Sequence, residues 1–252
     1  MGARVRTFDA ARSYGQAEGF LADWLHRRDI DPGAATISSK WGYTYVGAWR
    51  LDADHHEEKS HDLQTFLRQW DASRKVLWSH LDLYQVHSLT LESPLFEDVA
   101  LLEALAARKQ EHGISLGVTV TGPRQRETIE RVLSTAVDGV RLFDSIQATF
   151  NLLEPSVAPA LEKAHGEGMG IIIKEPIANG RLAPGRTDGK TAFLEDAAQA
   201  RGVSIDVLAL SFVLSFPFVD CVLSGAVTRV QLESNLRALS RPWDGSDAAL
   251  AA

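Results

Sequence analysis

Short apolar runs alternate with amphipathic segments along almost the whole chain. Several runs are apolar throughout, which is typical of parallel strands covered on both faces. Seven runs predict strands: residues 5–8, 36–39, 81–86, 115–119, 142–146, 170–173 and 219–223. Between them, apolar residues recur at helical spacing, most clearly in three sets: Leu63, Phe66, Leu67, Trp70 and Leu77; Val99, Leu102, Leu105 and Ala106; and Leu232, Leu236 and Leu239. This alternation predicts a parallel α/β sheet.

Composition narrows the class of protein. Hydrophobic residues make up 45% of the 252 residues and charged residues 23%, which allows a large packed core. The formal net charge of −7 disfavours a nucleic-acid-binding surface, since phosphates require clustered positive charge. No apolar run reaches the roughly 18 residues of a membrane span, so no membrane association is expected. A single cysteine, Cys221, favours a reducing compartment, and we expect a cytoplasmic protein.

Polar side chains that could take part in catalysis stand where three of the predicted strands end. Asp9 follows the first strand, with Tyr14 in the next turn, Lys40 ends the second strand and His87 ends the third. In a (β/α)8 barrel the carboxyl ends of the strands converge on one face, which carries the active site. These four side chains are therefore expected to meet although they are far apart in sequence.

The segment 8–15, Phe-Asp-Ala-Ala-Arg-Ser-Tyr-Gly, closely resembles the signature of the aldo-keto reductases. Members of that family are (β/α)8 TIM barrels that reduce carbonyl compounds with a nicotinamide cofactor. The resemblance implies that Tyr14 is the general acid that protonates the carbonyl oxygen. Lys40 would favour the phenolate form of Tyr14, Asp9 would hold Lys40 in place, and His87 would orient the substrate carbonyl.

A cofactor site is implied by several looser resemblances. Thr228 and Gln231 fit a capping box, so a helix is expected to start there and its N-terminus can bind phosphate. The surrounding segment resembles the family's adenosine-phosphate site, and an arginine there favours NADP(H) over NAD(H) because it can pair with the 2′-phosphate. The resemblance implies these cofactor-binding residues: Thr119, Gln147, Lys174, Pro176, Ile177, Gly180, Leu182, Gly225, Ala226, Arg229, Gln231 and Asn235.

Three positions depart from the family pattern. Val120 stands where many members have an asparagine, and valine cannot hydrogen-bond the nicotinamide carboxamide. Many members stack an aromatic ring on the nicotinamide near the position of Lys174, and Ser234 replaces an acidic residue that often contacts adenine. These departures point to weaker cofactor binding than the signature alone suggests.

The loop after Lys40, residues 41–60, is rich in aromatic residues, and such loops often shape substrate pockets. Trp41, Tyr45 and Trp49 are the candidate pocket residues, and the alternative is that such aromatic side chains pack the loop down. His55, His56 and His61 are expected on a solvated polar face rather than in a metal site, and no metal is expected.

Seven strands are visible where a barrel of this family has eight, and the first strand-helix unit is the one that is not seen. Three explanations are open: the true start of the protein lies upstream, the barrel is shortened, or a partner chain covers the gap. An open barrel edge favours association, so a homo-oligomer is expected. We expect one barrel domain over residues 1–240 and a tail over 241–252 that is frayed from Asp244 onward.

The sequence therefore predicts an oxidoreductase that reduces an aldehyde or ketone to an alcohol by hydride transfer from NADPH. Its only expected partner beyond a second copy is a small carbonyl substrate. Two alternatives remain at this point. One is a catalytically weak or inactive relative that binds a nucleotide or a partner protein, and the other is a truncated, inactive product whose open edge only associates.

Overall fold

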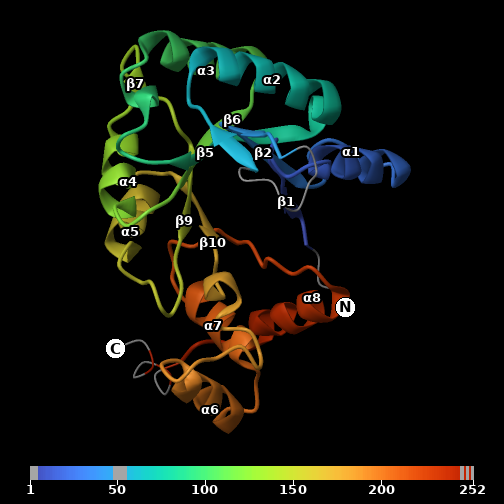
Figure 1. Ribbon diagram of the computed structural model, residues 1–252, viewed down its shortest axis with the longest axis vertical. Coiled ribbons are helices and arrows are strands. Elements are labelled where there is room, and N and C mark those ends of the chain that lie inside the picture. Colours follow the sequence, from blue (N-terminus) through green and yellow to red (C-terminus); the bar gives the residue numbers. More distant parts are fainter. Residues whose placement is uncertain (1–4, 48–55, 245–246, 248–249, 251–252) are drawn as a thin grey trace. The chain divides into compact units, whose positions relative to one another are not determined.

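The computed structural model describes residues 5–47 and 56–244, together with Asp247 and Leu250 (Figure 1). The chain divides into two compact units, Gly2–Ile146 and Gln147–Ala252. The first unit holds the predicted catalytic residues, and most of the predicted cofactor-binding residues lie in the second. The expectation of a single domain over residues 1–240 stays a prediction.

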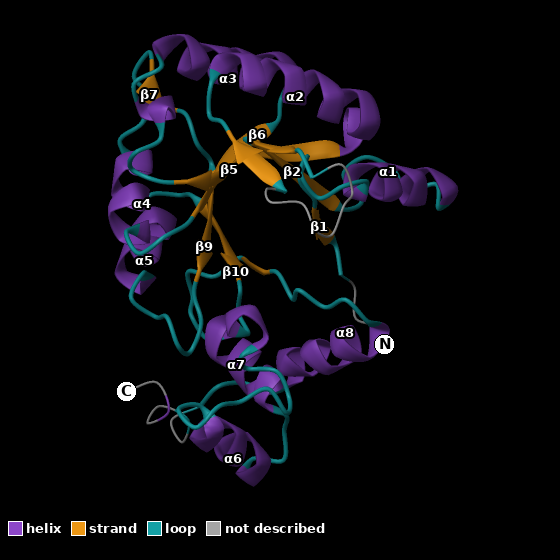
Figure 2. Cartoon of the chain, in the orientation of Figure 1, coloured by secondary structure: helices purple, strands orange, loops and turns teal. Residues whose placement is uncertain are grey.

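Among the described residues, seven parallel strands follow one another in the sheet in chain order. They are β1 (Thr7–Asp9), β2 (Thr36–Trp41), β5 (Leu81–Leu89), β6 (Ser115–Val120), β9 (Ser145–Thr149), β10 (Gly170–Lys174) and β11 (Cys221–Val222). Figure 2 shows them as orange arrows with purple helices between successive strands. A strand order that follows chain order, with a helix after each strand, is the (β/α)8 type of fold, and the predicted fold class is confirmed.

The described residues hold eight α-helices. They are α1 (Ala17–Arg27), α2 (Leu63–Leu77), α3 (Val99–His112), α4 (Gln125–Leu133), α5 (Ala158–Gly166), α6 (Ala192–Ala200), α7 (Ile205–Leu214) and α8 (Arg229–Leu236). Of these, α2, α3 and α8 overlap the three segments in which the helical spacing is clearest. Their ends have local causes. Helix α2 begins after Asp62, whose carboxylate accepts from the Thr65 N–H at 2.7 Å, and α3 ends at Gly113 in the left-handed region.

One predicted strand was placed about three residues too early. Residues 142–146 read as a strand, but Leu142 and Phe143 are buried loop residues and the strand β9 runs over Ser145–Thr149. The loop is apolar because it packs into the core. It is pinned by Asp144, whose carboxylate accepts from the Leu116 N–H at 2.9 Å and from the Lys109 ammonium at 2.7 Å.

Two short antiparallel pairs lie outside the main sheet. The first joins β3 (Tyr43–Tyr45) to β4 (Glu57–Lys59), within the segment that the sequence analysis treated as a loop. The second joins β7 (Ala136–Val137) to β8 (Val140–Arg141), just before the pinned loop.

In the first unit, β1, β2, β5 and β6 form a parallel ladder that brings the strand ends together. Asp9 pairs with Ser38, Lys40 with Gln85, and Val86 with Val118. Helices α2 and α3 lie side by side along this sheet (Figure 1). The register therefore places Asp9, Lys40 and His87 close together in space, at the carboxyl ends of three neighbouring strands.

In the second unit, β10 pairs with β11, and helix α7 is buried along nearly its whole length. Val207 and Leu210 of α7 pack with Ala238, and Ile177 and Val222 cover this cluster. Among the described residues, no single helix is long and apolar enough to cross a membrane. Helices α6 and α7 meet the length and composition requirement only when taken together across a bend of 87°.

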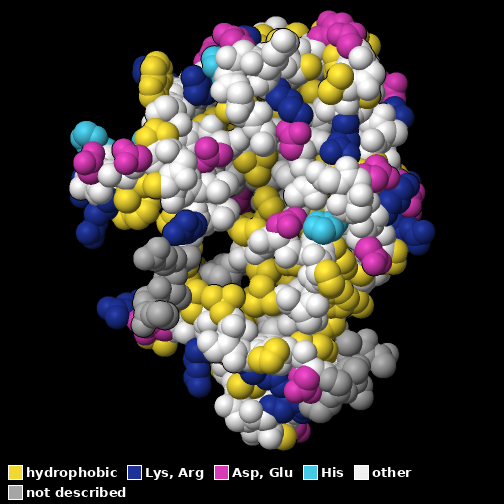
Figure 3. All heavy atoms as spheres, turned by 180° about the vertical axis from the view of Figure 1, so that it is seen from behind, with side chains coloured by type: hydrophobic (Ala, Val, Ile, Leu, Met, Phe, Trp, Pro, Cys, Tyr) yellow, Lys and Arg dark blue, Asp and Glu magenta, His cyan; other side chains and the backbone are white. Residues whose placement is uncertain are grey.

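Acidic and basic side chains are interspersed over the face of the protein in Figure 3. Yellow apolar side chains are also visible on this face, most densely around its lower middle. Such mixing of acidic and basic side chains is typical of a solvated protein surface.

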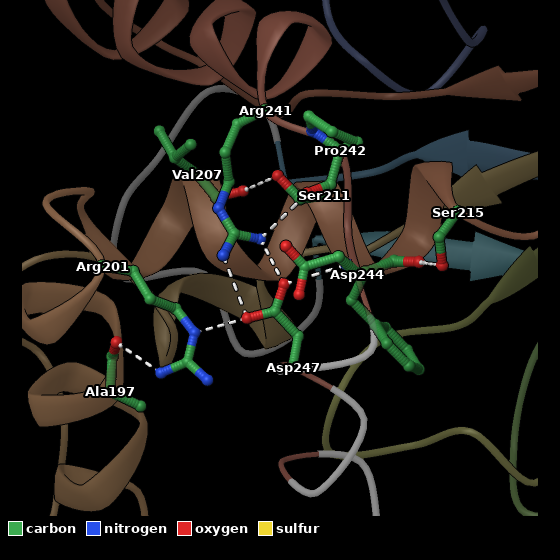
Figure 4. Close-up of polar contacts among 10 residues, drawn as sticks. Ala197, Arg201, Val207, Ser211, Ser215, Arg241, Pro242, Asp244 and Asp247 are labelled. Carbon is green, nitrogen blue, oxygen red and sulfur yellow. Dashed lines mark hydrogen bonds and ion pairs between the residues drawn. The ribbon is translucent and has the colours of Figure 1, made fainter.

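An ion-pair cluster holds the Asp247 carboxylate in the second unit (Figure 4). Arg241 donates to both of its oxygens, at 2.7 and 2.9 Å, Arg201 donates through Nε, and the Asp244 N–H donates at 3.2 Å. The Asp247 side chain is completely buried, so this residue of the expected frayed tail is instead firmly held. The hydrogen bonds from Arg241 lower the pKa of Asp247 from 3.8 to about 2.

Replacing Asp247 with Asn is expected to lower the free energy of unfolding by about 2 kcal/mol at neutral pH. Because the folded-state pKa is depressed, this contribution is fully present above the unfolded pKa of 3.8 and is lost as the pH falls through about 2. Urea unfolding of both proteins across this range checks it. The exposed Asp196→Asn is the control and should change little at any pH. A stability difference that persists unchanged at pH 2 would contradict the assignment.

Candidate active site

Asp9 and Lys40 form a buried ion pair at the ends of β1 and β2. The Lys40 ammonium lies 2.5 Å from Asp9 Oδ2 and donates to the Ala10 carbonyl at 2.9 Å. The Lys40 side chain is 1% exposed and that of Asp9 is 9% exposed. A lysine buried to this degree needs an opposite charge and further acceptors, and the structure supplies both.

The other oxygen of Asp9 is held by two residues that the sequence analysis did not single out. Ser38 Oγ donates to Asp9 Oδ1, and Gln85 Nε2 donates to the same oxygen at 3.0 Å. Ser38 stands two residues before Lys40, and Gln85 stands two residues before His87. Because side chains alternate between the two faces of a strand, the two members of each pair lie on the same face. Buried polar residues at this period-2 offset are the signal that could have identified them.

Tyr14 lies in the turn between β1 and α1, beside the ion pair. The Lys40 ammonium is 4.9 Å from the centre of the Tyr14 ring. The Tyr14 hydroxyl lies 3.5 Å from His87 Nε2, and the two rings meet edge to face with centroids 5.5 Å apart. Tyr14 is 49% exposed, so a half-exposed phenol ring stands next to a buried cation.

The buried carboxylate of Glu18 holds the turn that carries Tyr14. Glu18 of α1 accepts from Ser39 Oγ at 2.5 Å and from Ser73 Oγ at 2.7 Å, and it forms an ion pair with Arg12. The Arg12 N–H in turn donates to the Lys40 carbonyl at 3.0 Å. Glu18 thus ties the turn to β2 and α2, which restricts the positions that Tyr14 can take.

His87 lies where β5 leaves its neighbours. The β5–β6 register shifts between Val86 and Leu89, and Ser88 has a φ of 57°. The Ser88 N–H donates to Thr119 Oγ1 at 2.7 Å, so Thr119, a predicted cofactor-binding residue, fixes this irregularity. Bulges next to active sites often serve to aim a side chain, and here the bulge carries His87.

The structure therefore brings Asp9, Tyr14, Lys40 and His87 together within one unit, as the strand-end argument expected. A half-exposed phenol beside a buried ammonium can give up a proton and leave a stabilised phenolate. The imidazole beside it can donate or accept a hydrogen bond at the same place. The chemical roles assigned to the four residues stay predictions.

The predicted phosphate-binding segment precedes and begins α8 in the second unit. The capping box is confirmed: Gln231 N–H donates to Thr228 Oγ1 at 3.2 Å, and the Gln231 side chain accepts from the Thr228 N–H at 3.2 Å. Gly225 takes a φ of 63°, and Ala226 follows it. Asn235 is buried and donates to the Ser224 carbonyl at 3.1 Å, so it supports the turn.

Arg229 is the cation of this segment. Its side chain is 89% exposed, and its guanidinium pairs with Glu233 one helical turn along, at 2.7 Å. That hydrogen bond raises the pKa of Arg229, and the group stays charged throughout the physiological range.

The loop after β10 holds four predicted cofactor-binding residues. Lys174 ends the strand and pairs with Glu175 at 3.6 Å, while Pro176 and Leu182 are buried. Ile177 packs on the core of the second unit, and Gly180 has a φ of 87°. The side chain of Ile177 thus packs within the second unit. Gln147, on β9, is also buried.

The candidate pocket residues are placed differently from one another. Trp41 is 0% exposed and packs against Phe66 and His61, which favours the packing alternative for this residue. Tyr45 is half-buried and stacks on His56 with centroids 6.2 Å apart. Trp49 and His55 lie outside the described residues. Tyr43, another aromatic residue of this loop, lies edge to face with His87, with ring centroids 4.9 Å apart.

His61 was expected on a solvated face, and that expectation is wrong. It is 3% exposed and packs against Trp41, because the residue before the α2 N-cap points into the core. Within the part of the chain that the structure describes, no three His, Cys, Asp or Glu side chains gather as a metal ion would require.

The comparisons with known proteins agree on one family. A family model described as the aldo/keto reductase family matches residues 1–250. The fold is similar to that of the holo form of aldo-keto reductase AKR11C1 from Bacillus halodurans, with a TM-score of 0.77 and 20% identity, over 98% of this chain and 81% of that one. It is also similar to the putative aldo-keto reductase PA4992 from Pseudomonas aeruginosa, with a TM-score of 0.66 and 21% identity, over 92% of this chain and 76% of that one. The search of curated proteins gave no match.

Proposed function

Because the chain belongs to the aldo/keto reductase family, we propose that it reduces an aldehyde or ketone to an alcohol with NADP(H), with Tyr14 as general acid. One observation carries the proposal. The buried Lys40–Asp9 pair stands beside the half-exposed ring of Tyr14, whose hydroxyl lies 3.5 Å from His87 Nε2. A structural ion pair alone would not need an exposed phenol and an imidazole on its open side.

Each residue of the site has a part that its surroundings support. Asp9, held by Ser38 and Gln85, fixes the Lys40 ammonium close to Tyr14. Tyr14 Oη gives its proton to the carbonyl oxygen, and Lys40 stabilises the phenolate that remains. His87 donates from Nε2 to the same oxygen and orients the carbonyl. The nicotinamide cofactor supplies the hydride to the carbonyl carbon when it is bound.

The second unit offers donors that suit a dinucleotide phosphate. The exposed Arg229 guanidinium pairs with a surface carboxylate, Glu233, and a phosphate group can take the place of that carboxylate. The Gly225 turn lets the backbone approach a ligand closely. We therefore propose NADP(H) rather than NAD(H), with the 2′-phosphate bound by Arg229. The lone Cys221 supports a cytoplasmic setting for this reaction.

Replacing Arg229 with Ala is expected to weaken NADPH binding about 10-fold and to leave NADH binding unchanged, since only NADPH carries the 2′-phosphate. Tryptophan fluorescence titration with each nucleotide measures both affinities, since the chain has six tryptophans. Glu233→Gln is the matched variant, because it frees Arg229 from its carboxylate. It should keep or improve the affinity for NADPH. Equal losses for the two nucleotides in Arg229→Ala would count against the assignment.

The proposed function itself is tested by NADPH oxidation with a panel of aldehydes and ketones. We expect saturable binding of NADPH and turnover of at least one carbonyl class. Tight NADPH binding without any turnover across the panel would favour a nucleotide-binding protein that catalyses little. No response to either nucleotide would contradict the proposal as a whole.

A further inference from the structure

His61 stands at a junction of the segments that carry the candidate catalytic residues. It precedes Asp62, the N-cap of α2, so the start of this helix fixes its backbone. Its ring packs edge-on against Trp41, the residue after Lys40. The close approach is also visible at Gly42, where a Cβ atom would lie 2.7 Å from His61 Cδ2. The end of β2 is therefore packed directly around this imidazole.

Both nitrogens of His61 are bonded to protein groups, and the bonds identify its tautomer. Nε2 lies 2.8 Å from the His87 carbonyl oxygen, which can only accept, so Nε2 carries the proton and donates. Nδ1 lies 2.7 Å from Ser93 Oγ and accepts from that hydroxyl. Burial lowers the pKa of His61 to about 4, so the ring is neutral at physiological pH and keeps this arrangement.

The His87 carbonyl is where the strand ladder lapses. On the β2 side the register ends with the pair Trp41 and Val86, and on the β6 side it resumes only at Leu89. The Nε2–H group of the His61 ring therefore donates to the His87 carbonyl the hydrogen bond that a backbone N–H of a neighbouring strand donates elsewhere in the sheet. The backbone that sets the direction of the His87 ring is held by His61 on one side and, through Ser88, by Thr119 on the other.

We propose that His61 is a positioning residue for the reaction, which holds the His87 backbone so that the imidazole stays within reach of the Tyr14 hydroxyl. This inference rests on the proposed function, since it assigns His61 to the carbonyl-orienting part of that site. A shift of about 1 Å in a catalytic group can lower the rate on the order of 100-fold. Loss of a buried hydrogen bond that holds the His87 backbone is therefore expected to have a large effect on the rate.

Three variants separate the bond to His87 from the packing of the ring. His61→Gln places an amide N–H near the position of Nε2 and can still donate to the His87 carbonyl. His61→Asn reaches only the position of Nδ1 and loses that bond, and His61→Phe keeps a ring but loses both bonds. The control is His112→Asn on α3, which removes a half-buried imidazole that packs against Trp70 in the same unit.

Two measurements are made on the full chain of each variant: kcat and KM for the carbonyl compound, and the NMR signals of the His87 ring through a pH titration. We expect His61→Asn and His61→Phe to lower kcat/KM about 10- to 100-fold, with the Kd for NADPH unchanged and the His87 signals shifted. His61→Gln should stay within about 3-fold of the wild type, and His112→Asn should shift neither kcat/KM nor the His87 signals.

Unshifted His87 signals in folded His61→Asn or His61→Phe would overturn the inference, as would His61→Gln performing no better than His61→Asn. The NMR readout does not depend on turnover. If the wild type reduces no carbonyl, the proposed function fails, and the His87 signals alone decide whether His61 holds His87. If one of the two disruptive variants does not fold, the other is compared with His61→Gln.

Discussion

Replacing Tyr14 with Phe is expected to lower kcat for carbonyl reduction about 10³-fold and to leave the Kd for NADPH unchanged. The change removes one oxygen atom from a side chain that is half-exposed, so the fold has little to lose. It also removes the hydroxyl that lies 3.5 Å from His87 Nε2, on a ring whose centre is 4.9 Å from the Lys40 ammonium. Loss of the proton donor should therefore appear in the chemical step and not in cofactor binding.

Tyr43→Phe is the matched control for this prediction. Tyr43 also lies against His87, edge to face at 4.9 Å, but it stands on β3 and has no part in the Lys40–Asp9 pair. Steady-state kinetics of both variants, with fluorescence titration of NADPH, make the comparison. The account is contradicted if Tyr14→Phe keeps turnover within a few-fold of the wild type, or if the two variants lose it equally.

Replacing Lys40 with Met is expected to lower both activity and stability. Activity should fall about 10²- to 10³-fold, because the cation that stabilises the Tyr14 phenolate is gone. The free energy of unfolding should fall by about 3–5 kcal/mol, because Asp9 is left as a buried carboxylate without its opposite charge. Kinetics and urea unfolding at neutral pH measure the two effects on the same protein.

The double variant Asp9→Asn with Lys40→Met separates the two effects. It removes the buried carboxylate together with its partner, so much of the lost stability should return. Activity should not return, since the cation near Tyr14 is still absent. Recovery of activity along with stability would show that Lys40 serves the fold alone and would contradict its assignment to the chemistry.

The sequence was enough to predict the sheet and the meeting of the four polar residues. Asp9, Lys40 and His87 are polar residues at the ends of apolar runs, and parallel strand order alone brings such ends to one edge. The capping box of α8 was equally legible, because Thr228 and Gln231 are fixed by a local hydrogen-bond pattern. Features that depend on strand periodicity or on adjacent residues are thus within the reach of sequence reasoning.

Residues whose importance depends on distant partners were missed. Ser38 and Gln85 look like isolated polar residues in strands until the register places both beside Asp9. His61 stands in a run of acidic and histidine residues that looked solvated, yet its partners, His87 and Ser93, lie 26 and 32 positions away. Asp247 is held by Arg241 at the start of the same tail and by Arg201, which lies 46 positions earlier and is not revealed by the composition of the tail.

Apolar residues misled in the opposite direction. Leu142 and Phe143 suggested a strand because buried loop residues have the same composition as strand residues. Trp41 suggested a pocket wall because it begins the aromatic-rich loop after Lys40, but its ring fills the core against Phe66. Composition gives the degree of burial, and only the packing gives the side on which a residue is buried.

The most direct test of the central claim is hydride transfer itself. NADPH that carries deuterium at the transferable position is mixed with the protein and a carbonyl substrate from the panel, and the alcohol is examined by mass spectrometry. The account predicts an alcohol with one deuterium on the former carbonyl carbon with the wild type. Tyr14→Phe should form almost no deuterated alcohol in the same time under the same conditions. An alcohol without deuterium, or equal labelling by the two proteins, would contradict reduction by a site in which Tyr14 is the acid.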